Sequence, residues 1–347
     1  MIDYLIIGSG LAGIAFAETA LQNEKSIFVI DIDMQSASKV AAGLYNPVVL
    51  KRFTPVWDAN EQLKLLESFY SNLEAKLNCQ FNFKTPILRK FFSIEEQNNW
   101  FVAADTISLS PFLSTQLITK KYQSINSPFD YGKVNQTGYV NVALLIQEYK
   151  KYLIKENLFS NETFNHDNIV LLSDGIQYNN IKAKHIIFAE GFGMHFNPFF
   201  NDLPLDGAKG ELLIIKTLEL DLDVVVNTSI FILPLGNYLY KVGATYNWTD
   251  KSNTPTPEGK QELLYKLNEI LSCNFEVIKH YAGVRPTVKD RKPLIGTHPN
   301  HSALHVLNGL GTRGVMLGPT MAKVLFENIE FGKPINPEID IKRTYKK

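Results

Sequence analysis

The chain has 347 residues, of which 45% are hydrophobic and 20% are charged. That length and composition are those of a globular protein with a large core, and they allow two domains. The 35 lysines and arginines equal the 35 aspartates and glutamates in number, so no global field favours nucleic acid or an anionic membrane.

Cysteine spacing and hydropathy further limit the class of protein to which the chain can belong. Cys79 and Cys273 lack any CxxC or metal-ligand spacing, so we expect free thiols in a reducing compartment and no bound metal. No uninterrupted apolar run reaches the ~18 residues that a membrane span requires. The first predicted strand begins at Ile2 and leaves no room for a signal peptide. We therefore expect a cytoplasmic protein.

The strongest motif lies at the start of the chain. Residues 4–7 form a predicted strand, Gly8-Ser9-Gly10-Leu11-Ala12-Gly13 follows it, and residues 14–22 have helical spacing. A second predicted strand, residues 26–30, ends on Asp31. Strand, GxGxxG turn, helix, strand and acid in this order are typical of a dinucleotide-binding βαβ unit. An ordinary βαβ unit with a glycine turn is the alternative.

Each residue of this motif has a physical role. Gly8 permits the tight turn, Gly10 lets a pyrophosphate approach the backbone, and Gly13 lets the helix pack close to the sheet. The free N–H groups and the dipole of the helix would face the phosphates. Asp31 would accept hydrogen bonds from both ribose hydroxyls, which favours FAD or NAD over NADP.

The rest of the chain alternates helices and strands. Ser36, Ser38, Ala41, Ala42 and Gly43 are small residues, suited either to close contact with a flat cofactor or to a plain loop. Helices are predicted at residues 57–77, from 94 with Ser93 as N-cap, at 142–153 with Asn141 as N-cap, and at 257–271. Strands are predicted at residues 81–83, 87–91, 158–164, 169–173, 181–188 and 275–284, with a hairpin over 224–244 that turns at Gly236-Asn237.

A second glycine-rich turn precedes the last long helix. A predicted strand, residues 304–307, is followed by Gly309, Gly311 and Gly314 and then by an apolar helix of about eighteen residues. The spacing is not that of a Rossmann turn, yet it again brings a helix N-terminus to a glycine-rich loop. Two such turns far apart in the sequence suggest a cofactor long enough to reach both.

The chain resembles the FAD-dependent oxidoreductases of the D-amino-acid oxidase and glycine oxidase family over nearly its whole length. The resemblance rests on motifs in family order: GSGLAG with Asp31, SASKVAAGLYNP, GYVNVALL, HIIFAEGFG, LPLDGAKGELL, LPLGNYLYKVGAT, GVRPTVKDRKPLIG and GLGTRGVMLGP. It implies an α/β fold in which a Rossmann-like FAD-binding domain of the glutathione-reductase type is interleaved with an antiparallel-sheet α+β substrate domain. The implied boundaries are 1–78, 135–204 and 285–347 for the FAD-binding domain and 79–134 and 205–284 for the substrate domain.

The resemblance also implies where FAD binds. The cofactor would be extended and non-covalent, with the flavin pyrimidine end at the N-terminus of the last helix, whose dipole would stabilise negative charge on reduced flavin. The adenine would meet the backbone near Phe164. The residues expected to contact FAD are Gly8, Gly10, Leu11, Ala12, Gly13, Asp31, Ile32, Ser38, Ala42, Gly43, Leu44, Phe164, Ala189, Gly191, Arg285, Gly309, Gly311, Thr312, Arg313, Gly314, Val315 and Met316.

Four side chains make up the implied active site. Arg285, in GVRP, falls where the family's carboxylate-binding arginine sits, and its guanidinium would hold a substrate carboxylate through two parallel bonds. Phe231 and Tyr246 fall at pocket positions, where they replace the tyrosine and the smaller apolar residue usual in glycine oxidases. Lys241 matches a lysine that helps activate dioxygen in sarcosine oxidase-like relatives.

Each of these residues has a structural alternative. Arg285 could form a surface ion pair and Phe231 could be part of the core. Strand alternation favours a solvent-facing Lys241 over one that faces the flavin. Lys51 and Arg52 either approach the flavin from the loop before them or lie on a solvated face.

The implied activity is oxidation of the C–N bond of a small amine or amino acid. Glycine, a D-amino acid or an N-substituted glycine would be the substrate, with hydride transfer to flavin N5. Dioxygen or a quinone would then reoxidise the flavin.

Two other functions stay open. GLGTRG and GLYNP also resemble the flavin domain of the bifunctional enzyme that matures wobble uridine in tRNA, where it removes a carboxymethyl group. Zero net charge, and no methyltransferase half within these 347 residues, weigh against tRNA, whereas a basic rim at Lys51, Arg52, Lys289 and Arg313 would favour it. The third reading is a non-catalytic flavoprotein module, which an internal acid paired with Arg285 would favour.

Overall fold

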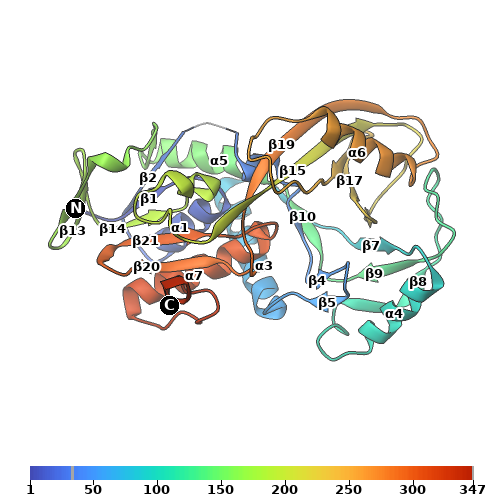
Figure 1. The fold of residues 1–347 in the computed structure, drawn as a ribbon, viewed down its shortest axis with the longest axis horizontal. Coiled ribbons are helices and arrows are strands. Elements are labelled where there is room, and N and C mark those ends of the chain that lie inside the picture. Colours follow the sequence, from blue (N-terminus) through green and yellow to red (C-terminus); the bar gives the residue numbers. More distant parts are fainter. Residues whose placement is uncertain (33–34, 346–347) are drawn as a thin grey trace.

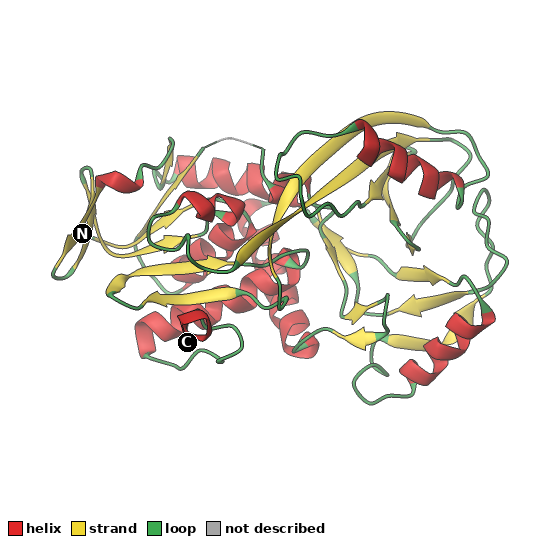
Figure 2. Ribbon diagram, viewed as in Figure 1, coloured by secondary structure: helices red, strands yellow, loops and turns green. Residues whose placement is uncertain are grey.

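The computed structural model describes residues 1–32 and 35–345, and it has two sheet-based lobes side by side (Figures 1 and 2). Both chain ends lie on the same lobe. Strands of the second sheet come between β2 (Ile27–Asp31) and β11 (Phe159–Asn161) in the sequence, and again between β14 (Ile181–Phe188) and β20 (Leu294–His298). The two lobes are therefore interleaved in sequence.

The first lobe is built on a sheet whose central strands are parallel. β1 (Ile2–Ile7) pairs with β2 and β14, and β11 (Phe159–Asn161) and β21 (His301–Asn308) extend the parallel set. Three strands join antiparallel, namely β12 (Ile169–Leu172), β13 (Gly175–Tyr178) and β20 (Leu294–His298). The central strands are continuous apolar runs because such sheets are covered on both faces.

Four long helices pack with this sheet. α1 (Leu11–Gln22) contacts α7 (Gly314–Phe331) and α5 (Val142–Lys155), and α3 (Ala59–Leu77) contacts α7. The largest apolar core lies among these helices and the sheet. The short elements of this lobe are α2 (Ala37–Val40), α8 (Lys342–Tyr345) and the 3₁₀ turns η1 (His166–Asn168) and η2 (Gly191–Phe196).

The second lobe is one eight-stranded sheet in the order β19-β15-β18-β17-β16-β7-β9-β8. Its strands are β7 (Ile87–Lys90), β8 (Leu113–Ile118), β9 (Tyr131–Val134), β15 (Leu205–Lys216), β16 (Val225–Asn227), β17 (Phe231–Gly236), β18 (Leu239–Gly243) and β19 (Glu276–Val288). Every neighbouring pair is antiparallel except β16 and β7, which run parallel. α6 (Pro257–Asn268) packs on β15, and α4 (Ile94–Ala104) packs on β8.

Two small sheets complete the fold. β10 (Gly138–Val140) pairs with β3 (Leu44–Tyr45) and β6 (Asn82–Lys84), and β4 (Val48–Val49) pairs with β5 (Thr54–Pro55). β6 thus joins strands from stretches assigned to the other domain, and β19 crosses the expected boundary at residue 285. The residue boundaries of the two domains stay a prediction.

Local signals in the sequence agree with the structure at both expected caps. The Ser93 hydroxyl accepts a hydrogen bond from the Glu96 N–H at 3.1 Å, and the Asn141 side chain accepts one from the Leu144 N–H at 3.3 Å. The β17–β18 hairpin turns at Asn237 and Tyr238, one residue later than predicted, because Gly236 still pairs with Leu239. The stretch before that turn forms two antiparallel strands rather than one, because the Thr228 hydroxyl and backbone close a turn onto Ile230.

Candidate functional site

A cavity of about 1060 Å³ runs between the two lobes, and it is lined by residues of both. One end lies at the N-terminus of α1 and another at the N-terminus of α7. The second lobe contributes the wall that contains Gly210, Phe231, Tyr246 and Arg285. The cavity therefore joins the two glycine-rich turns that are far apart in the sequence.

At the α1 end, Gly8 and Gly13 have the roles expected from the motif, in the tight turn and in close helix packing. Gly8 has φ +100°, and a Cβ there would lie 2.5 Å from the Ala189 carbonyl oxygen. A Cβ on Gly13 would lie 1.8 Å from the Gly8 carbonyl oxygen, so the helix contacts the turn directly. Gly10 faces the cavity, and the Ser38 Oγ, at 3.1 Å, is the nearest atom to a Cβ built there. Gly10 therefore lines the cavity with its backbone and leaves room for the Ser38 hydroxyl beside the turn.

Asp31 ends β2 at the edge of the cavity. Its carboxylate accepts hydrogen bonds from the N–H groups of Ser9 and Ile32, both at 2.8 Å, and from the Ser9 hydroxyl. An ionised carboxylate has about four acceptor sites, so capacity is left for a ribose hydroxyl. The bonds to Ser9 also fix the carboxylate beside the turn that would hold the pyrophosphate.

The N-termini of α1 and α7 both lack a side-chain cap. Gly10 and Arg313 are the N-cap residues, and neither side chain accepts a hydrogen bond from the first turn. In contrast, Asn141 and Thr256 cap α5 and α6. Only the Leu11 N–H of the α1 turn meets a hydroxyl, that of Ser38 at 3.3 Å. The uncapped ends leave N–H groups and positive helix dipoles facing the cavity, as anion-binding helix ends do.

Most of the expected cofactor residues line this cavity. They are Gly8, Gly10, Leu11, Ala12, Asp31, Ile32, Ser38, Ala42, Gly43, Leu44, Phe164, Ala189, Gly191, Arg285, Gly311, Thr312, Gly314 and Val315. Gly13, Gly309, Arg313 and Met316 do not line it. Gly13 contacts the Gly8 turn, and Met316 is 1% exposed in the core. The Arg313 guanidinium donates a hydrogen bond to the Asn46 carbonyl at 3.2 Å.

The cavity also includes residues that the sequence analysis did not select. Gln35, Phe192, Gly210, Lys251 and Asn253 all line it. Gly210 and Lys251 come from the second lobe, and nothing in their local sequence marks them as cavity residues. They reach the cavity because the sheet and its loops fold over the first lobe, which is a property of the tertiary structure.

Arg285 lies on β19 with its guanidinium against the wall of the cavity. Nη1 is 3.3 Å from the Thr245 carbonyl oxygen and 3.5 Å from the Ala208 carbonyl oxygen, and Cζ lies 4.5 Å from the centre of the Tyr246 ring. Burial lowers the pKa of this guanidinium below its ordinary value. No carboxylate among the described residues pairs with Arg285, so its surface ion pair is excluded within that part of the chain.

Gly210 leaves the room that the guanidinium occupies. A Cβ on Gly210 would lie 1.9 Å from Arg285 Nη2 and 2.1 Å from Cζ. β15 and β19 are paired here, with Ala208 opposite Arg285. Gly210 on β15 therefore leaves the space that the Arg285 side chain from the neighbouring strand β19 needs.

The two other pocket side chains differ in burial. Phe231 lines the cavity from β17 and also packs against the main core, so it takes part in both. Tyr246 is 52% exposed and covers Arg285 with its ring. Tyr246 follows β18 in a loop, and it shields one face of the guanidinium from water.

Lys241 does not face solvent, which corrects the expectation from strand alternation. Its Nζ donates to the Ala41 carbonyl at 3.2 Å, and burial lowers its pKa below the ordinary value. The side chain crosses from β18 to the loop that lines the cavity, without lining the cavity itself. The alternation of side chains along the strand gave the wrong prediction because the first lobe covers this face of the sheet. Lys51 and Arg52 are exposed and lie outside the cavity lining.

No three His, Cys, Asp or Glu side chains within residues 1–32 and 35–345 gather as metal ligands would. No helix in those ranges is long and apolar enough to cross a membrane.

The fold and the cavity define a dinucleotide-binding oxidoreductase with two interleaved lobes. The model of one family, the FAD dependent oxidoreductases of the D-amino-acid oxidase type, matches residues 3–328. The chain belongs to this family, and FAD is its cofactor. The cavity suits FAD because it joins two uncapped helix N-termini and passes an acid at the expected ribose position.

Individual relatives are similar at modest identity. The chain is 26% identical to glycine oxidase of Bacillus subtilis over 230 residues, which are 61% of this chain and 61% of that protein. It is 23% identical over 313 residues to the tRNA 5-methylaminomethyl-2-thiouridine biosynthesis bifunctional protein of Legionella pneumophila, covering 85% of this chain and 46% of that protein. The matches to curated relatives thus span less than two thirds of those proteins. The crystal structure of glycine oxidase from Bacillus cereus superposes with a TM-score of 0.77 at 22% identity, covering 97% of each chain, which supports the fold.

Proposed function

We propose that this protein oxidises the C–N bond of a small amine that carries a carboxylate, such as glycine, a D-amino acid or an N-substituted glycine. The observation that carries the proposal is Arg285, a cavity-lining guanidinium with no carboxylate partner among the residues described. A cation held in this way in a protein is a site for an anion. Glycine oxidases among the relatives support the same reading.

The residues of this chain would orient the substrate and exclude water. Arg285 would bind the carboxylate, and the carbonyls of Thr245 and Ala208 would hold its guanidinium in place. Phe231 and Tyr246 would form apolar walls around the α-carbon. Bound FAD would supply the hydride acceptor at N5, and the N-terminus of α7 would favour negative charge on the reduced ring. We also propose that FAD is bound non-covalently and that dioxygen or a quinone is the final electron acceptor.

A second candidate is removal of a carboxymethyl group from a modified wobble uridine in tRNA. This substrate also ends in a carboxylate on a secondary amine, so the same Arg285 would serve it. Lys51, Arg52 and Lys289 are exposed, as a basic rim for tRNA requires. The full rim is not assembled at the cavity, because Arg313 is directed to Asn46. We therefore favour the small substrate.

The third candidate, a non-catalytic module, called for an acid paired with Arg285. The described residues hold no such pair, and this observation speaks against it.

The test is anaerobic reduction of the FAD-loaded protein, followed by flavin absorbance, with a panel of amino acids and N-alkyl glycines. We expect bleaching by at least one small amino acid and its loss in Arg285→Ala. Lys279→Ala is the control, since Lys279 is an exposed cation on the same strand, β19, outside the cavity lining. Bleaching by carboxymethylated tRNA alone would move the assignment to the second candidate, and bleaching by neither would contradict both.

A further inference from the structure

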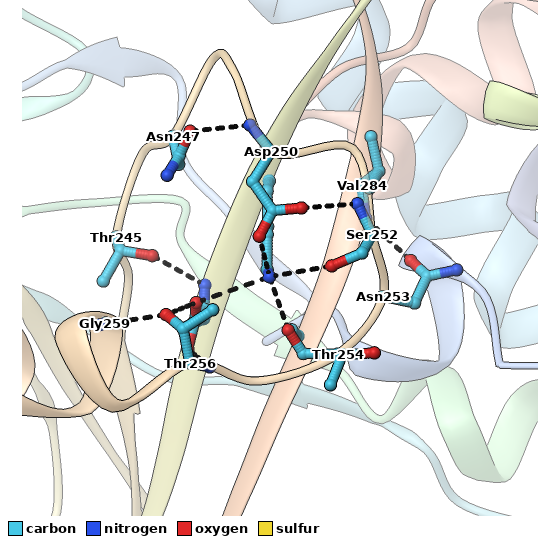
Figure 3. Close-up of polar contacts among 12 residues, drawn as sticks. Thr245, Asn247, Asp250, Ser252, Asn253, Thr254, Thr256, Gly259 and Val284 are labelled. Carbon is cyan, nitrogen blue, oxygen red and sulfur yellow. Dashed lines mark hydrogen bonds and ion pairs between the residues drawn. The ribbon is translucent and has the colours of Figure 1, made fainter.

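The most deeply buried charge in the second lobe is the ammonium group of Lys209. Lys209 lies on β15, and its side chain is 0% exposed. Its Nζ lies 2.5 Å from the Asp250 carboxylate and 3.2 Å from the Ser252 hydroxyl, and it also donates to the Thr254 carbonyl (Figure 3). A buried ammonium is costly unless it is paired and fully hydrogen-bonded. The three partners satisfy all three of its donors.

All three partners belong to one loop, residues 245–256, which we call the 245–256 loop. It joins β18 to α6, and it has no helix or strand of its own. A loop of this kind would have few constraints on its position. Here a single side chain from the sheet beneath it binds residues 250, 252 and 254, so the loop is held from below by the Lys209 charge.

Glu211 fixes both ends of the same loop. Its carboxylate accepts hydrogen bonds from the Thr256 N–H at 3.0 Å and the Thr256 hydroxyl at 2.7 Å. Its own N–H donates to the Thr245 hydroxyl at 2.9 Å (Figure 3). Lys209 exchanges two backbone hydrogen bonds with Asn247. Lys209 and Glu211 are two apart on β15, so their side chains point to the same face of the sheet.

The other side of the 245–256 loop forms part of the cavity wall. Tyr246, Lys251 and Asn253 line the cavity. The Thr245 carbonyl accepts from Arg285 Nη1, and the Tyr246 ring covers the same guanidinium. The loop therefore lies between the Lys209 charge and the group that would bind the substrate carboxylate.

We propose that Lys209 is a positioning residue for the carboxylate site. Through Asp250 it holds the 245–256 loop so that Thr245 and Tyr246 orient the Arg285 guanidinium toward the cavity. Lys209 itself does not line the cavity, so it acts only through the loop. This inference rests on the proposed function, because it needs a carboxylate-bearing substrate.

The test uses the FAD-loaded protein with Lys209→Met and Asp250→Asn. The second variant is included because Lys209→Met takes the cation away from the Glu211 carboxylate, which is 3.7 Å from Nζ and 4% exposed, and can impair folding. Asp250 is 30% exposed, and an amide keeps its shape. Lys266→Met is the control, since Lys266 pairs with Glu262 on the surface of α6, directly after the loop. Glycolate serves as the probe for the carboxylate site, and its dissociation constant is read from the flavin spectrum.

We expect both variants to weaken glycolate binding and raise KM by roughly tenfold, with kcat changed less, because a misplaced binding group costs this much. The combined variant should be no worse than Lys209→Met alone, because that change already removes the contact with Asp250. Limited proteolysis should cut faster within residues 245–256 in both variants, and FAD content should match that of Lys266→Met.

Two results would overturn the proposal. The first is that folded, FAD-loaded Asp250→Asn binds glycolate with unchanged affinity although proteases cut its 245–256 loop faster. The other is an equal loss of kcat, FAD content and thermal stability in both variants, which would indicate general support of the fold. If the unaltered protein binds neither glycolate nor any amino acid, the proposed function itself fails, and the role of Lys209 at a carboxylate site falls with it.

Discussion

The guanidinium of Arg285 lies 4.5 Å from the centre of the Tyr246 ring, with Tyr246 supplied by a loop and Arg285 by a strand. The ring face is negative and attracts the cation, and it leaves the other side of the guanidinium to the cavity. Because Tyr246 belongs to the 245–256 loop, a shift of that loop would also change the contact that holds the Arg285 guanidinium in place.

Replacing Tyr246 by alanine should weaken carboxylate binding by about twofold to fivefold, which is the strength of a partly exposed cation–π contact. Tyr246→Phe keeps the ring and should bind glycolate as the unaltered protein does. Flavin difference spectra during a glycolate titration give both dissociation constants. An equal loss in the two variants would mean that the hydroxyl group, rather than the ring face, matters.

Gly210→Ala should displace the Arg285 guanidinium, because the new methyl group would lie 1.9 Å from Nη2. We expect glycolate affinity to fall by more than about tenfold while FAD stays bound, since Gly210 is on the second lobe and the phosphate-binding turn is on the first. Gly318→Ala is the control, because Gly318 is outside the cavity lining and its Cβ would be 3.6 Å from the Ala15 Cβ, an ordinary contact. Normal glycolate binding by Gly210→Ala would show that the guanidinium has another position available.

Gly13→Ala should cost FAD binding and stability together. The Cβ would lie 1.8 Å from the backbone oxygen of Gly8, which cannot move without breaking the turn. Overpacking of this kind typically costs about 1–3 kcal/mol. Thermal melting with and without added FAD measures both effects. Gly318→Ala, within α7 and with its nearest contact at 3.6 Å, should be neutral or slightly stabilising.

Lys241→Met should distinguish flavin reduction by the substrate from flavin reoxidation by dioxygen. The Lys241 ammonium lies beside the cavity loop, and burial lowers its pKa. If its positive charge assists dioxygen, anaerobic flavin reduction should be unchanged while reoxidation slows. In the unaltered protein reoxidation should also slow as the pH rises through the lowered pKa, because the amine loses its charge. Stopped-flow reoxidation measures this, with exposed Lys279→Met as control. Equal reoxidation rates in both variants would assign Lys241 a structural role.

Stability should fall as the pH drops below the ordinary histidine pKa of 6.5. His305 Nε2 and His185 Nδ1 lie 3.0 Å apart in the first lobe, and burial keeps the pKa of His305 well below its usual value and lowers that of His185. The unfolded chain therefore binds more protons than the folded chain below pH 6.5, and protonation favours unfolding.

The slope of this loss is up to about 1.4 kcal/mol per pH unit for each histidine. Urea unfolding between about pH 8 and 5 gives the curve. The double replacement of His185 and His305 by glutamine should flatten it in this range. A curve of the same slope in that variant would attribute the pH dependence to other groups.

Several parts of the molecule were predictable because they depend on neighbours in the sequence. The GxGxxG turn, its helix and Asp31 lie within one βαβ unit, so spacing alone identified them. The caps at Ser93 and Asn141 and the hairpin turn next to Gly236 are also local. The second glycine-rich turn was recognised in the same way, and the structure brings it to the same cavity.

Other parts depended on contacts between distant residues. Alternation predicted a solvent-facing Lys241, and the covering of that sheet face by the first lobe reversed its environment. Neither Gly210 nor the 245–256 loop carries a local signal, because their roles arise from the pairing of β15 with β19 and from the buried Lys209 charge.

The sequence by itself thus determined the dinucleotide-binding unit and the family, since turn chemistry and periodicity act over a few residues. Only the tertiary structure decided that Arg285 has no acid partner in the described chain and that a loop held by Lys209 covers it. The physical reason is that charge pairing and burial depend on which strands become neighbours. That property belongs to the packed lobes and to no single segment.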